Sequence, residues 1–126
     1  MTIDSRKVIS DQDVQTRLAA ELPQWRLEGG MICRGYGTSG WKSSLLVVNA
    51  IGHLVEVAWH HPDIALSFYR VEVRLMSHDV RGITERDLQL AHKIEEFVLW
   101  RPKEEPESAF DGTPDADTRF AYLRYD

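Results

Sequence analysis

Hydrophobic positions recur along the chain with two periods, one typical of helices and one typical of strands. Three segments show the helical spacing of three or four residues. Their apolar positions are Val14, Leu18 and Leu22 in the first segment, Val47, Ile51, Leu54 and Ala58 in the second, and Leu88, Ala91, Ile94 and Val98 in the third. Residues spaced as capping boxes precede the first segment at Ser10 and the third at Thr84. The pattern therefore predicts three helices, which begin near residues 10, 42 and 84.

Extended segments lie between the predicted helices. Residues 25–27 and 31–36 flank Gly29-Gly30, an arrangement typical of a hairpin. Over residues 69–75 apolar and charged side chains alternate, which is the period of a strand with one buried and one solvent-facing side. Residues 35–40 are rich in Gly, Ser and Thr and predict a loop before the second helix. This order of elements, without a repeated strand–helix–strand unit, favours an α+β fold with helices on one face of a mainly antiparallel sheet.

Composition and charge narrow the class of protein. The chain has 126 residues, of which 43% are hydrophobic, enough for one domain with a sizeable core. A formal net charge of -5 without a cluster of Lys and Arg argues against direct nucleic-acid binding. No run approaches the roughly 20 apolar residues that cross a bilayer, and the polar start does not resemble a secretory signal. With Cys33 as its one cysteine the chain has no internal disulfide, and we expect a cytoplasmic protein.

The composition changes after Trp100. The remaining segment, residues 101–126, contains three prolines and has seven acidic against four basic residues. We therefore expect a domain over residues 1–100 followed by an acidic, Pro-containing C-terminal extension. The last residues of this extension are too apolar for a purely solvated tail, so we expect them to dock on the domain or on a neighbouring subunit.

Side chains suited to chemistry concentrate between residues 56 and 87. They are Glu56, His60, His61, Pro62, His78 and Asp87. Imidazole gives and accepts protons near neutral pH, so the set predicts general acid–base catalysis. Glu56 lies four residues before His60, the spacing of neighbours on a helix, and we expect its carboxylate to orient that ring. Pro62 fixes the path by which the chain leaves the helix, and so the direction of both preceding rings.

Simpler interpretations of these residues stay open. An isolated Glu–His pair is more often an ordinary surface pair, His78 could simply end a strand, and Asp87 also fits the capping box of Thr84. His53 and His92 lie within predicted helices away from the set, and we expect them to be solvated or packing residues. A zinc site would have enough donors, but adjacent histidines diverge and the spacing matches no common metalloenzyme pattern. A Ser-His-Asp hydrolase is disfavoured because the chain has no Gly-x-Ser-x-Gly motif.

The whole set resembles the signature of a known enzyme family. Glu56 is followed after three residues by His60-His61-Pro62, after five more by Phe68, after nine more by His78 and after eight more by Asp87. This spacing is similar to that of the pterin-4a-carbinolamine dehydratases, also known as 4a-hydroxytetrahydrobiopterin dehydratases. The resemblance covers about residues 10–99 and leaves the extension outside it.

The resemblance implies a fold, an assembly and a reaction. The fold would be a four-stranded antiparallel sheet with helices on one side, assembled into homodimers or homotetramers. The reaction would be loss of water from a 4a-hydroxytetrahydropterin, the product of aromatic amino acid hydroxylases, to give the quinonoid dihydropterin, without a metal or organic cofactor. By the same resemblance His60 and His78 would form the acid–base pair, His61 would hold the pterin, and Glu56 and Asp87 would orient or tune the rings.

The resemblance also leaves an alternative open. Proteins of this fold include binding modules that stabilise transcription-factor dimers or assist assembly of Rubisco, and such a module would have a protein partner. A module of that kind does not need the complete set of histidines and carboxylates, which favours the enzyme.

Overall fold

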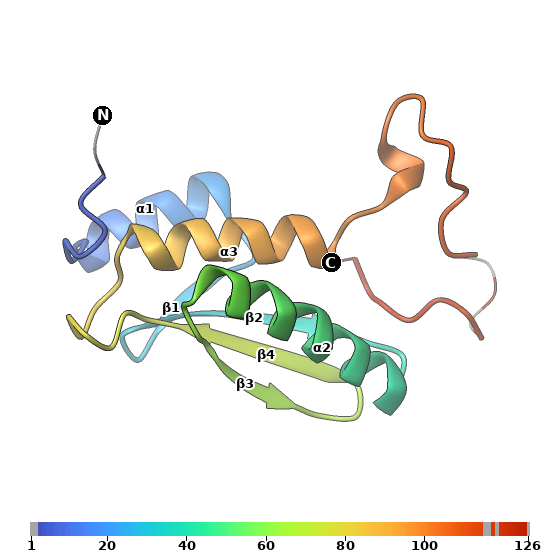
Figure 1. Cartoon of the computed structure of the whole chain (residues 1–126), viewed down its shortest axis with the longest axis horizontal. Coiled ribbons are helices and arrows are strands. Elements are labelled where there is room, and N and C mark those ends of the chain that lie inside the picture. The colour runs from blue at the N-terminus through green and yellow to red at the C-terminus, as the bar shows by residue number, and fades with distance from the viewer. Residues whose placement is uncertain (1–2, 115–116, 118, 126) are drawn as a thin grey trace.

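The structure is a computed structural model that describes residues 3–114, 117 and 119–125, and it has an α+β fold. The helices are α1 (Asp11–Glu21), α2 (Trp41–Ala58) and α3 (Glu85–Val98), followed by the short 3-10 helix η1 (Pro102–Glu104). The strands are β1 (Arg26–Glu28), β2 (Met31–Gly37), β3 (Asp63–Leu66) and β4 (Arg70–Leu75). All three α-helices lie on one side of the sheet (Figure 1). The expected fold class is thereby confirmed.

The four strands form one antiparallel sheet in the order β1-β2-β4-β3. Ile32 pairs with Leu75 and Tyr36 pairs with Val71, so these side chains share the face that the helices cover. All four are buried. The alternate positions of β4 carry charged side chains on the other face, as the period of two predicted.

The apolar faces of the three helices, which the sequence predicted, supply the other half of the core. The buried side chains are Val14 and Leu18 from α1, Val47, Ile51 and Val55 from α2, and Leu88, Leu90, Ala91 and Ile94 from α3. Ser10 caps α1 by accepting a hydrogen bond from the backbone of Asp13, as its position suggested. Ala58, which we placed on the apolar stripe of α2, is exposed because the helix ends there.

A polar network lies between α3 and the sheet. Glu95 accepts hydrogen bonds from Trp25 Nε1 at 3.1 Å, from Arg34 Nε at 3.0 Å and from the hydroxyl of Tyr36 at 2.6 Å. Burial, reinforced by the neighbouring Glu95 carboxylate, raises the pKa of the Tyr36 hydroxyl above its usual range. Because Arg34 is itself almost fully buried, the network is an internal ion pair rather than a surface one.

Two details of the sheet differ from the sequence expectation. The segment 35–40 is not a loop throughout, because β2 continues to Gly37 by pairing with Glu72 and Arg70. The guanidinium of Arg70 lies over Gly35, 2.1 Å from where a Cβ would stand, so a larger residue here would require this exposed side chain to move. The short strand β3 showed no clear hydrophobic period, since it is an edge strand of four residues with only half-buried side chains.

The C-terminal extension returns to the domain. Arg124 donates a backbone hydrogen bond to Gly37 at 2.9 Å, and Ser39 donates one to Tyr122 at 3.0 Å. Between them Leu123 forms an isolated β-bridge with Thr38 and packs against the core. Figure 1 shows this segment, in red, running back toward the end of α3. The end of the extension therefore packs on the domain beside residues 37–39, between β2 and α2.

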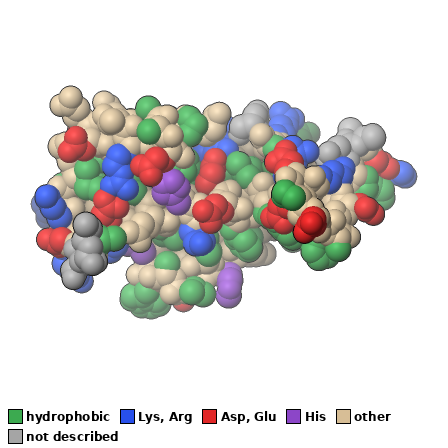
Figure 2. Space-filling model, turned by 90° about the horizontal axis from the view of Figure 1, so that it is seen from above, with side chains coloured by type: hydrophobic (Ala, Val, Ile, Leu, Met, Phe, Trp, Pro, Cys, Tyr) green, Lys and Arg blue, Asp and Glu red, His purple; other side chains and the backbone are tan. Residues whose placement is uncertain are grey.

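The surface has mixed charge. Seen from the side of α1 and α3, acidic and basic side chains are interspersed (Figure 2). Within the described part of the chain, no helix is both long and apolar enough to cross a membrane.

Candidate active site

The end of α2 places the two adjacent histidines. Trp59, directly after the helix, adopts the left-handed conformation with φ 52° and ψ 46°, which stops the helix and turns the chain. His60 and His61 follow in this turn, and Pro62 leads directly into β3. Because His60 no longer has helical geometry, the spacing of four from Glu56 does not bring those two side chains together.

The partner of Glu56 is His61. The two side chains lie with Nε2 and Oε1 2.5 Å apart, and both are largely exposed. The expectation that Glu56 orients His60 through helical spacing is therefore wrong, because the left-handed turn at Trp59 presents the second ring to the carboxylate instead. The ring of Trp59 also makes an edge contact with that of His61, with centroids 5.0 Å apart.

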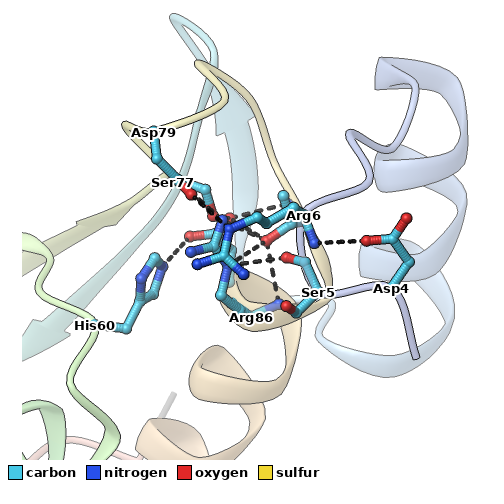
Figure 3. Close-up of polar contacts among 9 residues, drawn as sticks. Asp4, Ser5, Arg6, His60, Ser77, Asp79 and Arg86 are labelled. Atoms are coloured by element: carbon cyan, nitrogen blue, oxygen red, sulfur yellow. Dashed lines mark hydrogen bonds and ion pairs between the residues drawn. The ribbon is translucent and has the colours of Figure 1, made fainter. Parts of the chain in front are cut away.

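His60 pairs with Asp87. The His60 Nε2 atom lies 2.7 Å from Oδ1 of Asp87, and the carboxylate is fully buried while 14% of the imidazole is exposed. Figure 3 shows the ring of His60 with its dashed contact, beside the turn that carries Ser77 and Asp79. The contact joins residues 27 apart in the chain, from the turn after α2 and the first turn of α3.

The second oxygen of Asp87 is occupied by the start of α3. Its Oδ2 accepts the backbone N–H of Thr84 at 2.9 Å and the hydroxyl of Ser77 at 2.8 Å. Thr84 is the N-cap and Asp87 the third helical residue of a complete capping box. Both interpretations of Asp87 thus hold in the geometry: it caps α3 and contacts a histidine. The N-terminal end of the helix dipole also favours a negative charge at this position.

This arrangement selects the tautomer of His60. An ionised carboxylate can only accept hydrogen bonds, so Nε2 carries the proton and donates it to Asp87. Nδ1 is then the nitrogen that is left to accept or release a proton.

A cavity of about 430 Å³ lies against His60. Its wall is apolar on the side of α2 and mixed on the side of α3. The lining residues are Leu54, Val57 and Ala58 of α2, Trp59 directly after it, and Arg86, Gln89, Leu90 and Lys93 of α3. Apolar walls with a few polar groups are typical of small-molecule sites.

His78 lies apart from both pairs. It is exposed on the turn that follows β4, between Ser77 and Gly82, and among the described residues it has no hydrogen-bond or ion-pair partner. Its neighbour Ser77 is buried and contacts Asp87, so the backbone before His78 is tied to the His60 pair while its ring is free to meet a ligand. Phe68, part of the sequence signature, lies at the β3–β4 turn, at the far end of β3 from Pro62.

The remaining histidines lie elsewhere. His53 is exposed on α2, and His92 contacts Glu21 of α1 with 3.4 Å between Nε2 and Oε1. Among the residues that the structure describes, no three His, Cys, Asp or Glu side chains come together in a way that would hold a metal ion.

Sequence reasoning missed the contacts around Asp87. No role for Ser77 was predicted from the sequence, yet its hydroxyl donates to Asp87 and lies 2.8 Å from that of Thr84. Arg86, which no motif singled out, borders the cavity beside His60. Neither role has a signal in the sequence, because both depend on how the turn after β4 folds back on α3.

Comparison with known proteins gives one family. The family model described as pterin 4 alpha carbinolamine dehydratase matches residues 7–97. A protein of Aquifex aeolicus, provisionally named pterin-4-alpha-carbinolamine dehydratase, is 42% identical over 90 residues, which is 71% of this chain and 90% of that protein. A protein of Thermomicrobium roseum with the same provisional name is 39% identical over 81 residues, covering 64% of this chain and 87% of its own length.

A solved structure shares the fold. The crystal structure of a protein from Brucella melitensis described as transcriptional coactivator/pterin dehydratase superposes with a TM-score of 0.66 at 22% identity. The match covers 72% of this chain and 98% of that one.

Proposed function

Because the chain belongs to the pterin 4 alpha carbinolamine dehydratase family, we propose that it removes water from a 4a-hydroxytetrahydropterin to give the quinonoid dihydropterin. This reaction would recycle the cofactor of aromatic amino acid hydroxylases. It requires that the N5 proton be removed and that the departing 4a-hydroxyl be protonated. Both steps are proton transfers, which suits the histidines.

The observation that carries the proposal is the contact between His60 and the buried Asp87. A ring that is held at Nε2 and only slightly exposed can exchange a proton with a bound molecule through Nδ1. The adjacent cavity is lined in part by the same ring, so a small molecule there would meet it. We assign His60 to one proton transfer and His78, exposed and without a partner in the described chain, to the other.

His61 and Glu56 have a different role in the proposal. Their pair is exposed, so it adds little to stability and is accessible to a bound pterin. We assign His61 to holding the pterin, Glu56 to orienting His61, and Pro62 to directing both rings through the entry into β3.

Stopped-flow absorbance of enzymatically generated 4a-hydroxytetrahydropterin tests the proposal. Wild type should accelerate its decay to the quinonoid form, and His60→Ala should lower the rate by about 100-fold or more, the usual contribution of a general acid or base. His53→Ala is the matched control, because this exposed histidine of α2 contacts neither pair. If His60→Ala retains full turnover, His60 has no part in the mechanism.

A second candidate function is a protein-binding module of the same fold. It is favoured by large apolar side chains exposed on and directly after α2, which are Trp41, Leu45, Leu46, Val57 and Trp59. The same surface would serve a homodimer or homotetramer, and light scattering of the purified chain would measure the assembly. No acceleration of dehydration by wild type would leave the binding module as the better assignment.

A further inference from the structure

Two arginines contact Asp79 on the turn that carries His78, and Arg86 makes the shorter contact. Arg86, the second residue of α3, donates from its second terminal nitrogen to Oδ1 of Asp79 at 2.8 Å. From Nε it donates to the backbone carbonyl of Ser5 at 2.9 Å and, at 3.4 Å, to the hydroxyl of Thr84. Figure 3 shows Arg86 between the His78 turn on one side and the N-terminal segment on the other.

The N-terminal segment also contacts this turn and the start of α3. Arg6 Nε lies 3.5 Å from the other oxygen of Asp79, and Ile9 donates its N–H to the carbonyl of Ile83 at 2.8 Å. A Cβ at Gly82 would lie 2.7 Å from Cγ1 of Val8, so the N-terminal segment packs closely against the end of the turn. Asp4, Ser5 and Arg6 lie outside the residues that the family model matches.

The ring of His78 depends on this turn for its direction. No described residue bonds to the imidazole, so the backbone of residues 77–82 is what fixes the position from which the His78 side chain reaches out. That backbone is closed by reciprocal hydrogen bonds between Ser77 and Gly82 at 2.9 and 3.3 Å. Ser77 ties its inner end to Asp87. Among the described residues, Arg86 and Arg6 hold its outer part through Asp79, the residue next to His78.

From this geometry we infer that Arg86, through Asp79, is a positioning residue that aims His78 at the substrate. The inference rests on the proposed dehydratase function. Arg86 touches both sides of the site, since its side chain also lines the cavity beside His60. The planar guanidinium of Arg86 thus connects the turn that carries His78 with the cavity wall that includes His60.

The role is distinct from simple stabilisation. Asp79 is exposed and Arg86 partly so, and exposed ion pairs of this kind contribute little to folding. A displacement of about 1 Å of a catalytic group, by contrast, can cost turnover up to about 100-fold. Loss of Arg86 should therefore affect the rate more than the stability.

Arg86→Lys and Asp79→Ala test the inference in the full chain. Lysine keeps the charge but cannot reach Ser5, Thr84 and Asp79 at once, and Asp79 is exposed enough that its removal leaves the fold intact. Each should lower kcat about tenfold with KM changed less than about twofold. Arg17→Lys is the matched control, because Arg17 pairs with the neighbouring Glu85 and makes no contact with the turn.

Two further measurements separate positioning from general damage. In a His78→Ala background, Arg86→Lys should lower kcat no further, because the group it aims is already absent. The backbone ¹⁵N order parameter of His78 should fall from about 0.85 to below about 0.6 in Arg86→Lys and stay high in Arg17→Lys. Unchanged kcat in both turn variants, or an equal loss in the His78→Ala background, would overturn the inference.

The order parameter also separates this inference from the proposed function. If wild type shows no dehydration, the proposed function fails, and the order parameter alone decides whether Arg86 holds the turn. An order parameter of His78 that Arg86→Lys leaves unchanged overturns the inference whatever the activity.

Discussion

Replacing Asp87 by asparagine should reverse the tautomer of His60 while leaving the fold in place. At Oδ2 the carboxylate accepts from the backbone N–H of Thr84 and from two hydroxyl groups. An asparagine carbonyl can replace that oxygen, which puts the amide NH₂ against Nε2 of His60. Two donors cannot face each other, so Nε2 must become the acceptor and the ring proton must move to Nδ1. The nitrogen that should exchange protons with substrate is then blocked.

The cost should fall on catalysis rather than on stability. Asp87→Asn loses the charge at the helix N-terminus, about 1 kcal/mol, but keeps an acceptor for the cap. Asp87→Ala would instead lose the cap and leave the buried N–H of Thr84 unpaired, together about 2–4 kcal/mol. Turnover of Asp87→Asn should fall about 100-fold or more, because Nδ1 of His60 then carries the ring proton and cannot accept one from the substrate.

Stopped-flow turnover and urea unfolding of Asp87→Asn and Asp87→Ala measure the two costs separately. Trp25, buried and hydrogen-bonded to Glu95, provides a fluorescence signal for unfolding. The expected result is an Asn variant that is nearly as stable as wild type and almost inactive. An Asn variant with undiminished turnover across the neutral pH range would refute the reasoning, and His60 would not depend on Asp87 for its tautomer.

The other predictions concern stability. The hydrogen bond from Arg86 lowers the pKa of the Asp79 carboxyl in the folded protein. The ionised Asp79 therefore stabilises the fold fully above its unfolded-state pKa, and this stabilisation is lost as pH falls through the lower folded-state pKa. Urea unfolding at several pH values should show Asp79→Asn less stable than wild type at neutral pH, with the difference closing in acid; a constant difference would contradict this. Glu95→Ala should cost about 3–5 kcal/mol in urea unfolding because it breaks a buried ion pair with Arg34, and a loss below about 1 kcal/mol would show that the other contacts of Arg34 compensate. Gly52→Ala, where an added Cβ meets no atom within 4 Å, should stabilise α2 by about 1 kcal/mol in thermal unfolding; a loss of stability would mean that a second molecule packs on this face in solution.

The local elements could be predicted from the sequence because their causes are local. The helical stripes of α1, α2 and α3 and the cap residues Ser10 and Thr84 are patterns within a few residues, and the structure confirms them. The fourth strand, β3, was expected only through the family resemblance, and the end of β2 at Gly37 was not predicted, because both depend on pairing with β4 rather than on their own hydrophobic period.

The partners of the histidines could not be predicted in the same way. Spacing indicated Glu56 with His60, and the structure pairs Glu56 with His61 and His60 with Asp87. The difference arises at Trp59, whose left-handed backbone ends the helix one residue before the first histidine. A change of one residue in a helix end redirects every side chain that follows it.

The sequence by itself determined which groups are available for proton transfer, where the helices begin, and which faces are buried. Those properties follow from residue type and period, which need no distant contact. Only the tertiary structure decided that Asp87 would be buried against His60, that Ser77 and Thr84 would hold its other oxygen, and that Arg86 would hold the turn of His78. The reason is geometric: hydrogen bonds form between atoms about 3 Å apart, and only the packing of α2, β4 and α3 brings these atoms within that distance.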